Sequence, residues 1–344
     1  MSRQSDFAKI LREAFSLSSE WVDWFMKDVF VEEELKVAEV DNRPASFMLS
    51  TSYNMDFQGA EVECDYISCV ATFPSQRGKG LMRQLMHSTL KESWEKGVPF
   101  AALIPASRPL YFIYDRMGFA TVFYVDEERY TALHHFDKGD YQGVEPTYEM
   151  FSALERTYSG TIRHTEEQFR QILADIALEN GHVAAVSGPC GSEAIAFAED
   201  GAEVKVIDLL ATDMMAAEAA LADIRSQAGA KPIIVMSRPD ENSKTLRARG
   251  MIRIVNVLSV LQSIAKANPK ISMNIRITDR FLPENDGIYR LKSGKCDKIE
   301  LPTTDKISLD VTSKVLAEII FSAPNIGDLF NLPTHRPFIS LMLD

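Results

Sequence analysis

The chain has 344 residues, of which 46% are hydrophobic and 25% are charged, and its formal net charge is −12. This composition is typical of a globular protein with a sizeable core, and the length predicts two or three domains. The acidic balance argues against a nucleic-acid-binding protein, because nucleic acids are held by basic surfaces. No segment approaches the roughly 18 uncharged apolar residues of a membrane-spanning helix.

The N-terminal residues MSRQSDFAKILREAF carry charges within an apolar pattern and no small-residue cleavage site, which argues against a signal peptide. The cysteines have no metal-ligand spacing, and neither do the six histidines. We therefore expect no metal, a cytoplasmic protein and free buried thiols at Cys64, Cys69, Cys190 and Cys296.

The first predicted domain, residues 1–138, opens with an amphipathic helix and continues into strands. YISCVAT predicts a strand, and LMRQLMHSTLKESW predicts a helix that ends at Gly97. The continuous apolar run VPFAALIPA predicts a buried strand. SRPLYFIYDRMGF predicts a short helix, with Pro109 in its first turn and Gly118 at its end.

Two further units follow a segment rich in turn residues at 136–146. In residues 147–252, a capping box at Thr165 opens a helix, and two apolar runs at 182–200 predict a strand, a turn and a strand. In residues 253–344, ISMNIRIT alternates apolar and polar residues and predicts a half-buried strand, with further strands and a helix after it. The pattern of the whole chain is α/β, with an α+β third part.

The stretch ATFPSQRGKGLM lies between a predicted strand and a predicted helix. A glycine-rich turn at that place directs backbone N–H groups at an anion, and Arg77 and Lys79 add charge-assisted hydrogen bonds. The spacings of a P-loop and of a dinucleotide fingerprint are both absent. The residues alone predict a diphosphate site, with an ordinary turn of solvated residues as the alternative.

The same stretch resembles the acyl-CoA loop of the GNAT N-acetyltransferases, whose pattern is Q/R-x-x-G-x-G/A. Gly78 and Gly80 match it, whereas Ser75 stands where the family often has Gln or Arg. The later motif Tyr114-Asp115-Arg116-Met117-Gly118-Phe119 resembles the Eis ("enhanced intracellular survival") branch. This resemblance implies a catalytic GNAT domain at 1–138, a degenerate GNAT-like domain at 147–252, and a sterol-carrier-protein-like domain at 253–344.

The resemblance also implies roles for individual residues. Acetyl-CoA would be the co-substrate, contacted by Val70, Ala71, Thr72, Arg77, Gly78, Lys79, Gly80, Leu81, Met82, Arg83, Ser107 and Arg108. Tyr114 would be the general acid, because a phenol is protonated at neutral pH, and Tyr111 is its competitor. The C-terminal carboxylate of Asp344 would be the general base, although relatives commonly end in an aromatic residue.

The leading hypothesis is an N-acetyltransferase that acetylates a primary amine of a small cationic acceptor. One alternative is a sensor of acyl-CoA or a carrier of an apolar ligand that performs no turnover. Another is a protein-lysine acetyltransferase. We expect neither nucleic acid nor a membrane span among the partners, and a homo-oligomer remains open.

Overall fold

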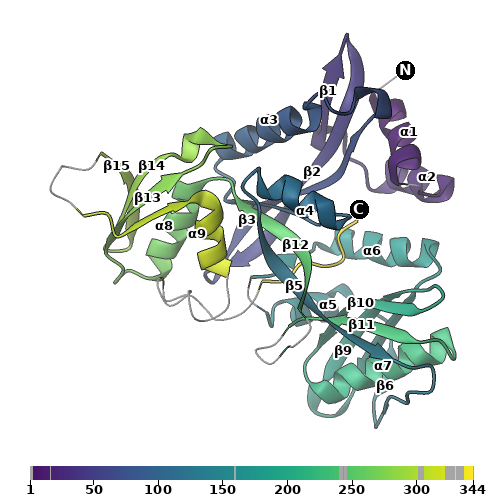
Figure 1. Ribbon diagram of the computed structural model, residues 1–344. Helices are drawn as coiled ribbons and strands as arrows, with labels where there is room; N and C mark the ends of the chain where they lie inside the picture. The colour runs from purple at the N-terminus through teal and green to yellow at the C-terminus, as the bar shows by residue number, and fades with distance from the viewer. Residues whose placement is uncertain are drawn as a thin grey trace. The chain divides into compact units, whose positions relative to one another are not determined.

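The computed structural model describes residues 3–15, 17–158, 160–239, 243, 246–300, 306–321, 330 and 337–343. These residues form two compact units (Figure 1). One unit takes its described residues from 1–123 and 249–336, and the other takes them from 124–248 and 337–343. Within these ranges, no helix combines the length and apolar character needed to cross a membrane.

The large sheet of the first unit has the strand order β1-β2-β3-β4-β12. Its strands are β1 (Leu35–Val40), β2 (Arg43–Phe57), β3 (Ala60–Thr72), β4 (Phe100–Leu103) and β12 (Leu246–Ile254). β3 and β4 are parallel, and their register ends at the pair Tyr66↔Ala102 although β3 continues to Thr72. All four residues of β4 are buried, as its continuous apolar run predicts.

Four helices accompany this sheet: α1 (Arg3–Phe15), α2 (Ser19–Asp28), α3 (Leu81–Lys96) and α4 (Arg108–Asp115). The predicted ends of two of them are confirmed. Gly97 caps α3 with φ +80°, and Pro109 lies in the first turn of α4. The apolar face of α1 packs with α2 and with the end of β3 in one buried cluster, which includes Phe7, Leu11, Trp21, Phe25 and Ala71.

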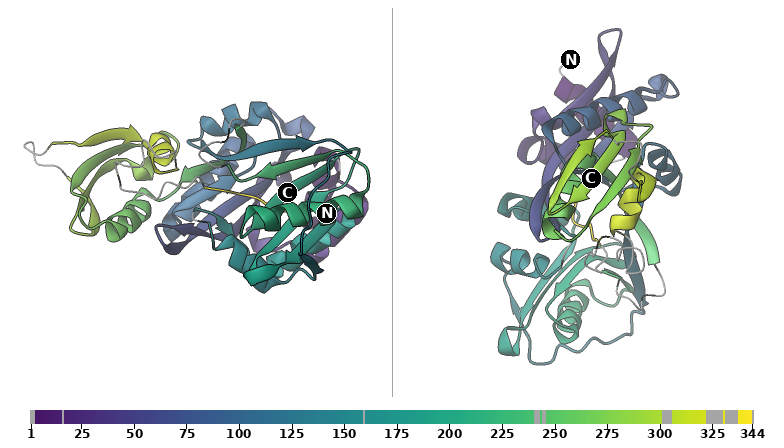
Figure 2. Two further views of the ribbon diagram at one scale, coloured as in Figure 1. Left: turned by 90° about the horizontal axis from the view of Figure 1, so that it is seen from below. Right: turned by 90° about the vertical axis from the view of Figure 1, so that its left-hand side faces the viewer.

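The first unit also contains a four-stranded sheet with the order β15-β14-β13-β16. Its strands are β13 (Met273–Thr278), β14 (Gly287–Lys292), β15 (Lys295–Ile299) and β16 (Leu309–Thr312), and two helices, α8 (Val257–Ala267) and α9 (Ser313–Phe321), accompany it. α8 packs against β14 and β15 (Figures 1 and 2). Ile275 and Ile277 are buried and Arg276 is exposed, which confirms the alternation predicted for this strand.

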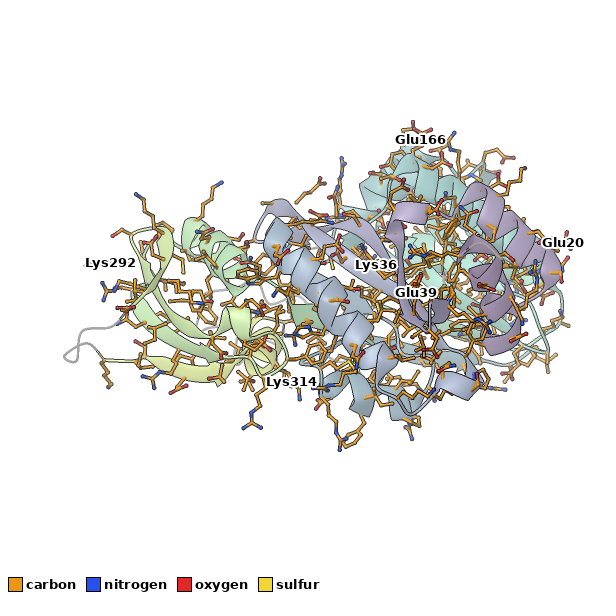
Figure 3. The ribbon with its side chains drawn as sticks, turned by 90° about the horizontal axis from the view of Figure 1, so that it is seen from above. Glu20, Lys36, Glu39, Glu166, Lys292 and Lys314 are labelled. Atoms are coloured by element: carbon orange, nitrogen blue, oxygen red, sulfur yellow. The ribbon has the colours of Figure 1, made fainter. Side chains whose placement is uncertain are left out.

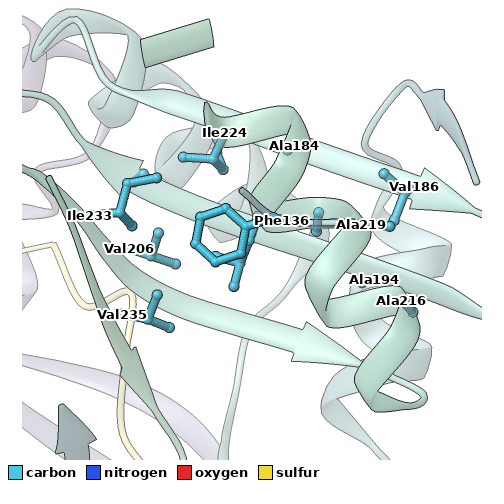
Figure 4. Packing of buried hydrophobic residues seen from close by; sticks show 14 of the residues in the cluster. Phe136, Ala184, Val186, Ala194, Val206, Ala216, Ala219, Ile224, Ile233 and Val235 are labelled. Atoms are coloured by element: carbon cyan, nitrogen blue, oxygen red, sulfur yellow. The ribbon is translucent and has the colours of Figure 1, made fainter. Parts of the chain in front are cut away.

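The second unit has the strand order β5-β11-β10-β9-β8-β6. These strands are β5 (Ala120–Tyr130), which begins in the first unit, β6 (Gln142–Val144), β8 (His182–Ser187), β9 (Glu193–Glu199), β10 (Val204–Ala211) and β11 (Ile233–Ser237). Its helices are α5 (Tyr148–Glu155), α6 (Glu166–Leu178) and α7 (Met214–Ala228). The short strand β7 (Ile162–Arg163) lies between α5 and α6 in the sequence. Phe136 packs between α7 and the sheet, beside Val206 and Ile224 (Figure 4).

The strand, turn and strand predicted at 182–200 are confirmed by β8, the turn at Pro189–Gly191 and β9. The capping box at Thr165 is present, with its hydroxyl bonded to the N–H of Gln168. The turn-rich segment at 136–146 contains β6, which pairs with β8 and was not predicted. Cys190 is exposed rather than buried, because it lies in a tight turn with φ +60°.

The predicted domain boundaries do not follow the two units. Residues 251–254 of β12 pair with β4 and belong to the first unit, so the boundary expected after residue 252 falls inside a strand. Periodicity marks elements in chain order and carries no information on which sheet a strand joins. The three-domain division therefore stays a prediction.

The C-terminal segment 337–343 packs into the second unit. Phe338 exchanges backbone hydrogen bonds with Gly160 and Ile162, and Ser340 donates to the buried carboxylate of Asp208 at 2.6 Å. Leu341 is buried in the core with α5 and α6. The apolar approach to the chain end is thus docked in the second unit, whereas Asp344 lies outside the described residues.

Candidate functional site

A cavity of about 600 Å³ lies in the first unit between the end of β3, the start of α3 and one side of α4. This volume is in the usual range for small-molecule sites. The lining residues are Ala14, Phe15, Val70, Ala71, Thr72, Gln76, Arg77, Gly78, Gly80, Leu81, Met82, Arg83, Leu110, Ile113, Tyr114, Arg116 and Met117.

The glycines of the loop have a backbone conformation that other residues rarely adopt. Gly78 has φ +78°, and Gly80, the N-cap of α3, has φ +77°. A Cβ atom added to either would meet no atom within 4 Å, so the space in front of both is open. No side chain caps α3, and the first N–H groups of a helix have no intrahelical partner. The loop therefore offers free N–H groups, with the positive end of the helix dipole, to an anion.

Three cationic side chains surround this loop in different ways. Arg77 lines the cavity, and its Nε donates to the carbonyl oxygen of Thr72 at 3.1 Å, which ties the loop to the end of β3. Arg83 also lines the cavity. Lys79 does not line it, and its ammonium bonds to the side chain of Gln76 at 2.7 Å.

The end of β3 presents backbone groups to the cavity. The register of β3 with β2 shifts between Phe47 and Leu49, and Cys69 has φ +50°, which marks a bulge. Val70, Ala71 and Thr72 follow the bulge and line the cavity. Because pairing with β4 ends at Tyr66, this edge of β3 is left for a ligand that binds as an extra strand would.

Tyr114 lines the cavity and carries a titratable phenol. Its side chain is only 6% exposed, and its ring packs edge-on against Phe119 at 5.9 Å between centroids. Burial raises the pKa of Tyr114 to about 12. The Tyr114 hydroxyl has no hydrogen-bond partner among the described residues. Because its pKa lies far above neutral, the phenol keeps its proton and can donate it into the cavity that Tyr114 lines.

The structure thus brings most of the predicted site residues to one cavity. Lys79, Ser107 and Arg108 do not line it: Ser107 is the N-cap of α4, Arg108 begins this helix, and both are exposed. Asp344 lies outside the described residues. The roles of all these residues in binding and catalysis stay predictions.

The sequence interpretation missed several lining residues. Phe15 is the last residue of α1, and Gln76 lies within the loop, and neither was assigned a role in the site. Leu110, Ile113 and Met117 lie on or just after α4, where the spacing from Tyr114 could have placed them on one side of the helix. In the described part of the chain, no cluster of three or more His, Cys, Asp or Glu side chains is arranged to hold a metal ion.

Residues 2–122 match the family model of the acetyltransferase (GNAT) domain. No curated protein sequence matches the chain. Among solved structures, the chain resembles a probable N-acyltransferase from Enterococcus faecalis, with a TM-score of 0.77 and 16% identity over 98% of this chain and 96% of the other. It also resembles a GCN5-related N-acetyltransferase from Anabaena variabilis, with a TM-score of 0.73 and 18% identity over 94% and 89% of the two chains.

A third similar structure is Eis1 from Mycobacterium abscessus, with a TM-score of 0.70 and 16% identity over 97% of this chain and 95% of that protein. Identities this low establish a common fold, whereas the family match bears on chemistry. The match over residues 2–122 supports an acyltransferase enzyme, and the GNAT fold implies acetyl-CoA as co-substrate.

Proposed function

We propose that this acyltransferase transfers an acetyl group from acetyl-CoA to a primary amine of a small cationic acceptor. The observation that carries the proposal is the cavity itself, which is lined both by the glycine-rich N-terminus of α3 and by the buried phenol of Tyr114. The first suits a diphosphate, and the second suits a thiolate leaving group. Acetyl-CoA carries both of these groups in one molecule.

The residues present fit this co-substrate. The open space in front of Gly78 and Gly80 lets a diphosphate approach the backbone N–H groups of α3. Arg77 and Arg83 also line the cavity and supply positive charge. The part of β3 at Val70–Thr72, which lies beyond the register with β4, suits the amide groups of the pantetheine arm, which would bond to it as a neighbouring strand does.

In the proposed reaction, the amine nitrogen attacks the thioester carbonyl carbon, so that a C–N bond forms as the C–S bond breaks. The Tyr114 hydroxyl donates its proton to the departing thiolate and regains one from solvent. The surplus proton on the amine passes to a base, for which the resemblance implies the C-terminal carboxylate of Asp344.

The acceptor class rests on charge and on the family. A net charge of −12 favours approach of a cation by long-range attraction, which accelerates encounter. A lysine side chain is also a cationic primary amine, so peptide acceptors belong in the test. We further propose the three-part Eis-type division, with a sterol-carrier-like third part, and its support is the coverage of 97% and 95% in the match with Eis1.

The test is release of free thiol from acetyl-CoA over a panel of polyamines, aminoglycosides and lysine peptides, with a thermal-shift titration of CoA alone. Thiol release that requires a small polycationic amine supports the proposal, and release with peptides alone favours a lysine acetyltransferase. A thermal shift with CoA but no turnover across the panel would favour a sensor or carrier. Absence of any shift would contradict the assignment of the cavity.

A further inference from the structure

Arg253 in β12 is fully buried, with 0% of its surface exposed. Its Nη2 donates to both carboxylate oxygens of Asp279, at 2.8 and 2.7 Å, and its Nη1 donates to the backbone carbonyl of Met117. Its Nε has no hydrogen-bond partner among the described residues. A buried ion pair with an unsatisfied N–H contributes little net stability. The geometry that the pair imposes is therefore the better explanation of its presence.

The Met117 carbonyl belongs to the turn that closes onto Tyr114. The N–H groups of Met117 and Phe119 both donate to the Tyr114 carbonyl oxygen, at 2.9 and 3.2 Å. Gly118 lies between them with φ +83°, and a Cβ atom there would be 1.7 Å from Nη1 of Arg253. The guanidinium reaches the Met117 carbonyl because residue 118 has no side chain, and it thereby holds the turn next to Tyr114.

Asp279 is held in turn by several donors besides Arg253. They are the backbone N–H groups of Phe281 and Leu282 at 3.1 and 3.0 Å, the side-chain amide of Asn285 at 3.2 Å, and the hydroxyl of Ser313 at 2.8 Å. Burial acts to raise the pKa of Asp279, but the charge and hydrogen bonds of Arg253, together with the hydrogen bonds from Ser313 and the Leu282 N–H, lower it below its usual value. The carboxylate stays ionised and keeps Arg253 in one orientation.

Residues after 249 also contact Arg83, which lines the cavity, and the helix α4. The ring of Phe281 lies 4.9 Å from the guanidinium carbon of Arg83 and 5.5 Å from that of Arg253. Lys314, at the start of α9, pairs with Asp115 at 2.5 Å, and Figure 3 labels its side chain. Residues from beyond 249 therefore contact both Arg83 and the helix that carries Tyr114.

We propose that Arg253 and Asp279 are positioning residues for acyl transfer, since they fix the turn at Met117–Phe119 and through it the hydroxyl of Tyr114. Residues beyond 249 thereby complete the acetyltransferase domain that the match covers at 2–122. This inference rests on the proposed acid role of Tyr114. A displacement of about 1 Å in a reacting group costs roughly 100-fold in rate. Loss of the bond to Met117 should therefore lower kcat by about tenfold or more and leave KM for acetyl-CoA unchanged.

The test is a double-mutant cycle that combines Arg253→Lys with Tyr114→Phe, with turnover of acetyl-CoA and an accepted amine as the readout. A lysine ammonium cannot hold Asp279 and the Met117 carbonyl in the fork geometry of arginine. We expect Arg253→Lys to lower kcat about tenfold in the parent and to cause no further loss in Tyr114→Phe. The same fold-loss in both backgrounds would overturn the inference, because it would mean a general structural role.

The control is Arg276→Lys, which changes an exposed arginine of the same region that pairs with Asp310 at 3.0 Å, and it should leave kcat at the parental value. If Arg253→Lys does not fold, the cycle uses Arg253→Met combined with Asp279→Leu, because replacement of a whole buried ion pair by apolar residues is often tolerated. Parental kcat in that folded double variant would overturn the inference. Parental kcat in Tyr114→Phe alone would instead overturn the proposed acid role, and the inference with it.

Discussion

Gly118 and Arg253 lie in direct contact, so close that a Cβ atom on Gly118 would be 1.7 Å from Nη1 of the guanidinium. The two residues are far apart in the sequence, and the contact joins the end of α4 to β12. Gly97 offers a matched comparison, because it ends α3 with φ +80° against +83° for Gly118, and an added Cβ would meet its nearest atom at 3.9 Å.

Gly118→Ala should therefore destabilise the protein more than Gly97→Ala does. Both variants place a Cβ in the left-handed region, at a cost of about 1–2 kcal/mol. Only Gly118→Ala also displaces a buried charged side chain, which should raise the total loss to about 4 kcal/mol. Urea unfolding of both variants measures the difference, and equal losses would mean that Arg253 moves aside without cost.

Gly80→Ala should weaken binding of acetyl-CoA. In the free protein a Cβ at this position meets no atom within 4 Å, so only the backbone strain is added. In the complex the methyl group would occupy the path of the diphosphate to the N–H groups of α3. We expect KM for acetyl-CoA to rise tenfold or more, measured by initial rates. Gly97→Ala is the control, with similar strain and no effect on KM.

Arg77→Met should raise KM for acetyl-CoA about tenfold, the loss of one charge-assisted hydrogen bond. The same substitution at Lys79, which lies outside the cavity lining and bonds to Gln76, should have a smaller effect. S-acetylpantetheine, a thioester without the diphosphate, distinguishes a loss of diphosphate binding from damage to the fold. With S-acetylpantetheine as substrate, the two variants and the parent should have equal KM. A KM that stays raised in Arg77→Met would mean that Arg77 does not act through the diphosphate.

The fold of the local elements was largely accessible from the sequence. The glycine that ends α3, the proline that opens α4 and the capping box at Thr165 depend on neighbours in the chain, and all three are confirmed. The loop at residues 77–80 was identified for the same reason, because its glycines must adopt positive φ for the strand to turn into the helix.

The tertiary partners of these elements were not accessible. Nothing in the periodicity of the segment around Arg253 indicates that it pairs with β4, or that an arginine is buried there. Its partner Asp279 follows a half-exposed strand and looks like an ordinary turn residue until the structure brings the two together. The cavity residue Phe15 was missed because an apolar helix face suits a core and a ligand site equally.

The acid role of Tyr114 predicts an unusual insensitivity to alkaline pH. Burial raises its pKa to about 12, so the hydroxyl keeps its proton through pH 10, where a tyrosine with an ordinary pKa near 10 would be half ionised. We expect kcat at saturating substrates to show no loss between pH 7 and 10 from this group. A loss with a midpoint below pH 10 that is present in the parent and absent in Tyr114→Phe would mean that Tyr114 ionises there, and would contradict its raised pKa.

The most direct test of the central claim compares thiol release from acetyl-CoA in the parent, Tyr114→Phe and Tyr111→Phe. General acid catalysis contributes at least about 100-fold, so Tyr114→Phe should lower amine-dependent kcat by about that factor with KM for acetyl-CoA unchanged. Tyr111→Phe removes the hydroxyl of the other tyrosine in α4, which does not line the cavity, and should keep the parental kcat. Equal kcat in the parent and in Tyr114→Phe would contradict the account.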